Sequence, residues 1–205
     1  MTVDGPARVR MAPDTRREQL LALGVRLLST RSLDELSIDV LAEAAGISRG
    51  LLYHYFGTKR DFHRAVVRRA ADDLIEVTAP VQSGAPLERL AKSLEAYVNY
   101  VVANLEGYTS LVRGAAGGDE DLREIYEEAR AALTDRIFDV AGEEGVLELL
   151  GVSDSPAVRL MVRGWSAMVE DVVLSWVNEP RGVPKDDLLG MLAGALPGVL
   201  APPAG

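Results

Sequence analysis

Apolar side chains recur at helical spacing along almost the entire chain of 205 residues, and the strict alternation of a half-buried β-strand is nearly absent. Residues 15–30 show the pattern, because Leu20, Leu23, Leu27 and Leu28 fall on one face of a helix. The spacing predicts an all-α fold of about nine helices. No apolar run approaches the ~18–20 residues that a membrane-spanning helix needs, so we expect no membrane contact.

Residues that favour helix starts divide the chain into these helices. A Ser or Thr side chain accepts a hydrogen bond from a first-turn N–H, and Pro is favoured at the first helical position. Two capping boxes are expected, formed by Thr15 with Glu18 and by Thr58 with Asp61. The predicted helices cover residues 15–30, 37–45, 48–55, 58–79, 86–105, 107–116, 119–141, 155–178 and 184–197.

Charge is divided unevenly along the chain, although the net charge is −9. Residues 1–71 hold 12 Lys and Arg against 8 Asp and Glu, whereas residues 72–205 hold 10 against 23. The basic N-terminal third can approach phosphate, and the acidic remainder suits partners or small ligands. The chain has no cysteine, which excludes disulfides and thiolate metal sites and fits a reducing cytoplasm, where we expect the protein to act.

Residues 37–59 have the mechanics of a helix-turn-helix. Gly46 stands where the first of two short helices must stop, and glycine adopts the left-handed conformation of such a stop without strain. Ile47 fills the core at the turn, and Ser48 caps the next helix immediately afterwards. Two short helices joined by a short glycine-containing turn are the unit that places a recognition helix in a DNA groove.

The second short helix carries side chains suited to DNA. Arg49 can donate two hydrogen bonds to a guanine, Leu51 can contact a thymine methyl group, and Gly50 permits close approach of the backbone. The candidates for phosphate contacts are Tyr53, His54 and Lys59. An ordinary solvated side chain is the alternative at each position. Such a solvated face is what we expect of Arg64, Arg68 and Arg69 on the following helix.

Residues 15–65 resemble the DNA-binding domain of the TetR family of bacterial repressors. The matching positions are Leu41, Ala42, Ala45, Gly46, Ile47, Ser48, Gly50, Tyr53, Tyr55, Phe56 and Lys59. Asp39 departs from the pattern, because some relatives place a basic or neutral residue there, facing phosphate. The resemblance implies repression at a palindromic operator in double-stranded DNA. The positions that it places at or beside the DNA are Ser37, Ser48, Arg49, Gly50, Leu51, Tyr53, His54 and Lys59.

The two C-terminal helices, near residues 155–178 and 185–200, predict a homodimer. The first is apolar around most of its circumference, so it must be covered on more than one side. We expect one side to face its own domain and the other to face a second copy, in a four-helix interface as in the family. A two-fold pair of recognition helices can then read a palindrome.

A small-molecule effector site is the second site that the resemblance implies, and we expect a largely hydrophobic ligand. Binding would move the long helix 58–79 and change the spacing of the recognition helices. For any single candidate, ordinary core packing is an equally good interpretation. The candidate lining residues are Tyr97, Tyr100, Asn104, Tyr108, Leu111, Tyr126, Trp165, Met168, Val169 and Val172.

These patterns divide the chain into four parts. We expect a disordered arm over 1–13, a helix-turn-helix domain over 14–60 linked by helix 58–79, an effector-binding and dimerisation domain over 80–200, and a disordered tail over 201–205. Two separated histidines and the lack of nucleotide-binding or nucleophile motifs argue against an enzyme, and neither a metal nor a cofactor is expected. The alternative function is a helical small-molecule- or partner-binding protein without sequence-specific DNA binding.

Overall fold

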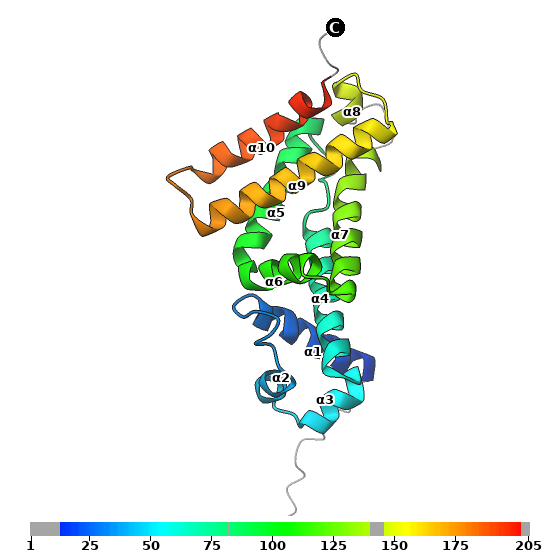
Figure 1. Ribbon diagram of the computed structural model, residues 1–205, viewed down its shortest axis with the longest axis vertical. Coiled ribbons are helices and arrows are strands. Elements are labelled where there is room, and N and C mark those ends of the chain that lie inside the picture. Colours follow the sequence, from blue (N-terminus) through cyan, green and yellow to red (C-terminus); the bar gives the residue numbers. More distant parts are fainter. Residues whose placement is uncertain (1–12, 82, 140–145, 202–205) are drawn as a thin grey trace, which may run out of the picture.

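The computed structural model describes residues 13–81, 83–139 and 146–201, and in these ranges every regular element is a helix (Figure 1). The predicted all-α fold is confirmed. The helices are α1 (Pro13–Leu28), α2 (Ile38–Ala45), α3 (Arg49–Phe56), α4 (Lys59–Val77), α5 (Pro86–Ala103), α6 (Leu105–Ala116), α7 (Glu120–Asp139), α8 (Val146–Leu149), α9 (Pro156–Asn178) and α10 (Lys185–Leu200).

The helices form two parts that α4 connects. Helices α1, α2 and α3 lie at one end of the molecule, and α4 runs from them into a larger body, where α7 lies beside it (Figure 1). Helices α9 and α10 pack together and cover α5. Helix α4 therefore connects α3, the predicted recognition helix, to the body.

Two hydrophobic cores follow from this arrangement. One is built from α1–α4 but also takes in Leu111 of α6 and Leu122 and Ile125 of α7. The other joins α5, α9 and α10 with Leu74 of α4 and Leu147 of α8. Because α6 and α7 contribute to the first core, helices α1–α3 pack directly on the body and are not connected to it through α4 alone.

Ion pairs join α4 to α7 along their outer sides. Arg60 pairs with Asp121 at 2.5 Å, Arg64 Nη2 lies 3.3 Å from the Glu124 carboxylate, and the Arg68 guanidinium pairs with Glu128. Arg69 reaches Glu18 of α1 at 2.8 Å and Asp73 at 2.7 Å. The prediction of a merely solvated face for Arg64, Arg68 and Arg69 is wrong, because the acidic residues of α7 and α1 lie opposite them.

Most of the predicted helix starts are confirmed. Ser37, Ser48 and Ser155 each accept a first-turn N–H, and Thr58 with Asp61 forms a complete capping box. The first predicted capping box is wrong: α1 begins at Pro13, so Thr15 lies inside the helix.

The C-terminal end differs from the prediction in two places. Helix α10 does not end near Pro197 but continues to Leu200, because buried Leu196 and Leu200 hold its last turn against the core. The short α8 was not expected, so the described residues hold ten helices rather than about nine. The predicted arm and tail fall almost entirely on residues 1–12 and 202–205, which lie outside the described residues. No helix within the described ranges combines the length and apolar character that crossing a bilayer requires.

Candidate functional site

The turn between α2 and α3 has the geometry that its sequence predicts. The Ser37 hydroxyl accepts a hydrogen bond from the Val40 N–H at 3.2 Å and fixes the start of α2. Gly46 ends α2 at φ 63°, in the left-handed region, and the Ile47 N–H donates to the Ala42 carbonyl at 3.0 Å. This pattern closes a helix and favours a glycine, here Gly46, because a side chain raises the energy of the left-handed backbone conformation.

Helix α3 buries one side and exposes the other. Leu52 and Phe56 lie in the core, whereas the outer side presents Tyr53, which is 47% exposed, together with Arg49 and His54. The Ser48 hydroxyl accepts the Leu51 N–H at 3.3 Å and starts this helix. The anchored inner side holds the outer side chains in a fixed direction, as a recognition helix requires.

Seven of the eight residues predicted to lie at the DNA are exposed together at this end of the molecule. Ser37 is half-buried, and its hydroxyl serves as the cap of α2. The exposed ones are Ser48, Arg49, Gly50, Leu51, Tyr53, His54 and Lys59. Their contact with DNA stays a prediction.

Asp39, the acidic residue that departs from the family pattern, pairs with a residue of the next helix. Its carboxylate forms an ion pair with the guanidinium of Arg49, across the turn between α2 and α3. Both side chains remain largely exposed. The sequence reasoning missed this pair, because nothing in the spacing of the two residues shows how the two helices cross.

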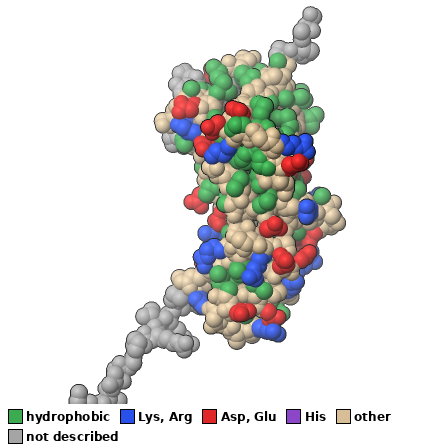
Figure 2. Space-filling view, turned by 90° about the vertical axis from the view of Figure 1, so that its left-hand side faces the viewer, with side chains coloured by type: hydrophobic (Ala, Val, Ile, Leu, Met, Phe, Trp, Pro, Cys, Tyr) green, Lys and Arg blue, Asp and Glu red, His purple; other side chains and the backbone are tan. Residues whose placement is uncertain are grey.

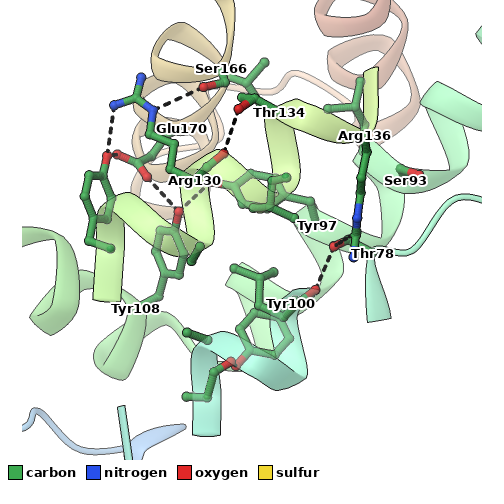
Figure 3. A pocket seen from close by; sticks show the side chains of 18 of the residues that line it. Thr78, Ser93, Tyr97, Tyr100, Tyr108, Arg130, Thr134, Arg136, Ser166 and Glu170 are labelled. Atoms are coloured by element: carbon green, nitrogen blue, oxygen red, sulfur yellow. Dashed lines mark hydrogen bonds between the residues drawn. The ribbon is translucent and has the colours of Figure 1, made fainter. Parts of the chain in front are cut away.

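A cavity of about 170 Å³ lies inside the body, between α4, α5, α6, α7 and α9 (Figure 3). Its wall is mostly apolar, with a few polar groups on opposite sides. Glu170, Arg130 and Ser166 lie on one side, and Thr78, Ser93 and Arg136 lie on the other. A concave apolar space with a few directed polar groups is the usual form of a small-molecule site.

Eight of the ten predicted lining residues border this cavity. They are Tyr97, Tyr100, Asn104, Tyr108, Leu111, Tyr126, Trp165 and Val169. Met168 and Val172 do not border it, because they face other parts of the core that α9 shares with α5 and α10. That the eight bind a ligand stays a prediction.

Of the residues of α7 that form this wall, the sequence reasoning found only Tyr126. Tyr126, Ala129, Leu133 and Ile137 border the cavity, and their spacing of three, four and four residues is a helical face that the sequence displays. It also missed Val25 and Leu28 of α1, although it placed Leu28 on the apolar face of that helix. The cavity therefore touches the helix-turn-helix domain itself.

Tyrosine hydroxyls and one carboxylate form a network on one side of the cavity (Figure 3). The hydroxyls of Tyr108 and Tyr126 each donate to the Glu170 carboxylate at 2.8 Å, and the Tyr97 and Tyr108 hydroxyls lie 2.9 Å apart. Burial raises the pKa of the Tyr126 hydroxyl to about 12 and raises the pKa of Tyr97 further. These hydroxyls therefore remain protonated donors, and both oxygens of Glu170 are occupied.

The outer side of α9 and α10 exposes large apolar side chains. Leu160 is 68% exposed and Met191 58% exposed, with Met161 nearby in sequence. Gly190 and Gly194 have no neighbouring atom within 4 Å of the place where a Cβ would stand. Hydrophobic side chains gather in this upper part of the molecule in the space-filling view (Figure 2).

Comparison with known proteins decides the family. The family described as bacterial regulatory proteins, tetR family, matches residues 20–66, and the tetracyclin repressor-like C-terminal domain matches residues 86–194. A tetR-family transcriptional regulator from Streptomyces coelicolor is 32% identical, with a TM-score of 0.78 over 92% of this chain and 82% of that chain. The chain belongs to the TetR family.

Two named regulators are also similar to this TetR-family chain. The transcriptional activator FasR of Mycolicibacterium smegmatis is 26% identical over 179 residues, which are 86% of this chain and 79% of that protein. The transcriptional repressor KstR2 of the same organism is 35% identical over 88 residues, which are 39% of this chain and 43% of that protein. The chain is thus a DNA-binding transcriptional regulator with an N-terminal helix-turn-helix.

Proposed function

We propose that this regulator binds a palindromic operator as a homodimer, and that a small, largely hydrophobic ligand in the cavity changes its affinity for that operator. One observation carries the proposal: the apolar cavity of the body is bounded by Val25 and Leu28 of α1 and by residues of α4, which belong to or continue from the helix-turn-helix domain. A ligand there touches the DNA-binding part directly.

The exposed side of α3 supports operator binding. Arg49, Tyr53 and Lys59 are all exposed at this end of the molecule. A guanidinium can donate two hydrogen bonds to a guanine, and a phenol or an ammonium group can donate to phosphates. Lys59 is the first residue of α4, so a phosphate contact there also fixes the base of the helix that borders the cavity.

The exposed apolar side of α9 and α10 supports the homodimer. Large side chains such as Leu160 and Met191 lie beside glycines that leave room for a partner helix to approach. An apolar surface of this kind on a protein marks an interface. A two-fold pair through this surface presents two recognition helices, as a palindromic operator requires.

The cavity supports regulation by a ligand. A ligand changes DNA affinity only if it binds one conformation of the dimer more tightly than another. Small movements of α1 or α4 at the cavity wall should move α3, because Leu52 and Phe56 of α3 lie in the same hydrophobic core as residues of α1 and α4. The names of the relatives include an activator and a repressor. Repression by this chain stays an expectation from the family resemblance.

Operator binding is tested by fluorescence anisotropy, with DNA from the gene's own upstream region and from a genome-wide fragment selection. Tyr53→Ala should weaken binding to all sequences alike, and Arg49→Ala should weaken binding mainly where a guanine is read. Lys92→Ala is the matched control, because Lys92 pairs with Glu88 in α5, outside the helix-turn-helix. A selection that yields no bound fragment would contradict the proposal.

The dimer is tested by the measured mass in solution. Leu160→Asp places a charge on the exposed side of α9 and should convert the dimer to a monomer, because an unpaired charge in an apolar interface is strongly unfavourable. Val102→Asp is the control, because Val102 is 50% exposed on α5, outside the proposed interface. A monomeric wild-type protein, or a dimer that survives Leu160→Asp, would reject this interface.

A further inference from the structure

The charged side chains that border the cavity are mainly positive. Among the described residues, Arg89, Arg130 and Arg136 border it, and Glu170 is the one carboxylate that does. Glu170 and Arg136 lie on opposite sides (Figure 3). The side of Glu170 also carries Arg130 and so holds one charge of each sign, whereas the side of Arg136 holds a cation, with an apolar wall between the two sides.

Arg136 is held only by neutral acceptors within the described part of the chain. It donates to the Thr78 hydroxyl at 3.1 Å and to the Ile75 carbonyl, both at the C-terminal end of α4. No ion pair with a described carboxylate is formed. Burial lowers the pKa of its guanidinium, yet an arginine remains charged in a protein. A cation against an apolar wall without a counter-charge favours an anion.

The opposite side carries both a carboxylate and a guanidinium. Both carboxylate oxygens of Glu170 accept tyrosine hydroxyls, and Arg130 donates to Ser166 at 3.2 Å and to the Arg163 carbonyl at 2.9 Å. Arg130 also donates to the Tyr126 hydroxyl at 3.4 Å, and its positive charge is offset by the carboxylate of Glu170 on the same side. An anion is therefore attracted less to this side than to the side of Arg136. The two sides together impose one orientation on a charged ligand.

The apolar part of the cavity, between its polar groups and α1, suits a hydrocarbon chain. Along α7 the bordering residues extend from Tyr126 to Ile137, a helical rise of ~16 Å. At the far end the wall is formed by Val25, Leu28 and Leu111, which are all apolar. A chain that starts at Arg136 can therefore reach the helix-turn-helix domain.

We propose that the cavity takes an amphiphile with one anionic group, a carboxylate or a phosphate, which binds Arg136 while its hydrocarbon chain lies along α7 toward α1. This inference rests on the proposed function, in which the cavity is the effector site. The inference also supplies a mechanism. The anion competes for the guanidinium N–H groups that Arg136 donates to the Ile75 carbonyl and the Thr78 hydroxyl. Binding loosens the link between α7 and the end of α4.

The preference is measured by tryptophan fluorescence in a Trp176→Phe background, in which the signal comes from Trp165 at the cavity. Dodecanoate, dodecyl phosphate and dodecan-1-ol are titrated below the concentrations at which they form micelles. Both anions should bind at least about tenfold more tightly than the alcohol, as charge-assisted hydrogen bonds allow. In Arg136→Gln this ratio should fall to near one while the alcohol binds as before, which also shows that the variant folds.

Two further variants complete the test. Arg136→Lys keeps the charge and should keep most of the ratio, and Arg113→Gln, on the exposed side of α6, should keep all of it. A wild-type ratio near one, or a ratio that survives Arg136→Gln, would overturn the inference. DNA binding is measured in parallel by fluorescence anisotropy. If the protein binds no DNA but still prefers the anions, the proposed regulatory function is rejected and the anion site in the cavity is supported.

Discussion

The guanidinium of Arg49 forms an ion pair with the carboxylate of Asp39, and the pair bridges the two helices of the helix-turn-helix. A carboxylate on this surface repels phosphate. It also holds the guanidinium of Arg49 in one direction before DNA arrives. We infer that Asp39 lowers general affinity for DNA and raises selectivity for the sequence that Arg49 reads.

Asp39→Asn separates these two effects. Non-specific affinity should rise roughly two- to fivefold, which is the range that exposed ion pairs allow, because a negative charge is removed. The ratio of operator to non-specific affinity should fall, because Arg49 is no longer held. Anisotropy with operator and scrambled duplexes measures both, with Glu43→Gln as a control of equal charge on α2. Equal weakening of both complexes would show that Asp39 acts only on folding.

Gly50 allows a test in which stability and function move in opposite directions. A Cβ at Gly50 would meet only the Ser48 hydroxyl at 4.0 Å, so Gly50→Ala fits without strain. It should stabilise α3 by up to ~1 kcal/mol and raise the Tm by about 2–4 °C. DNA binding should weaken, because the added methyl group faces the DNA. A variant that is more stable and binds DNA unchanged would show that α3 approaches DNA less closely than we propose.

Gly46 behaves differently because its φ of 63° is the left-handed conformation. Gly46→Ala meets no atom within 4 Å, so its effect comes from the backbone alone. We expect a loss of roughly 1–2 kcal/mol in the free energy of unfolding. Urea unfolding measures it, and an unchanged midpoint would mean that the turn relaxes.

The helix-turn-helix could be predicted from the sequence because its signals are local. The Ser37 and Ser48 caps and the Gly46 stop each act within a few residues of their own position. The Asp39–Arg49 pair could not be predicted, because it depends on how α2 and α3 cross.

The cavity was only partly predictable for a similar reason. The sequence correctly indicated eight of the lining residues, seven of them on or between α5, α6 and α9 and the eighth, Tyr126, on α7. Helical periodicity alone does not show which side of a wholly apolar helix meets the cavity, and Met168 and Val172 of α9 therefore lie elsewhere. The apolar face of α7 was hidden among charged residues such as Arg130 and Arg136, which themselves border the cavity.

The pair between Arg68 and Glu128 permits a charge-swap test of the contact between α4 and α7. Arg68→Glu places two carboxylates against each other and should lower stability by about 0.2–1 kcal/mol, as expected for an exposed pair. Combining Arg68→Glu with Glu128→Arg should restore the stability, because the two charges are again opposite. The Tm at low and high salt measures the effect, which should shrink as salt screens the charges. Additive losses in the double variant would show that the two side chains do not interact.

His63 makes the stability of the part formed by α1–α4 depend on pH. Its Nε2 lies 2.6 Å from the Leu36 carbonyl, and burial lowers the pKa of the imidazole below its ordinary value. The unfolded chain, with a histidine pKa of about 6.5, then binds a proton that the folded chain excludes. The contribution to stability is complete above about pH 6.5 and is lost as the pH falls toward the folded pKa.

His63→Gln should reduce this pH dependence. Its amide can still donate to Leu36 but does not titrate. Urea midpoints at about pH 7.5 and about pH 6, on either side of the unfolded value, should differ less in the variant than in the wild type. His54→Gln, an exposed position on α3, is the matched control. An equal difference in wild type and His63→Gln would assign the pH dependence to other groups.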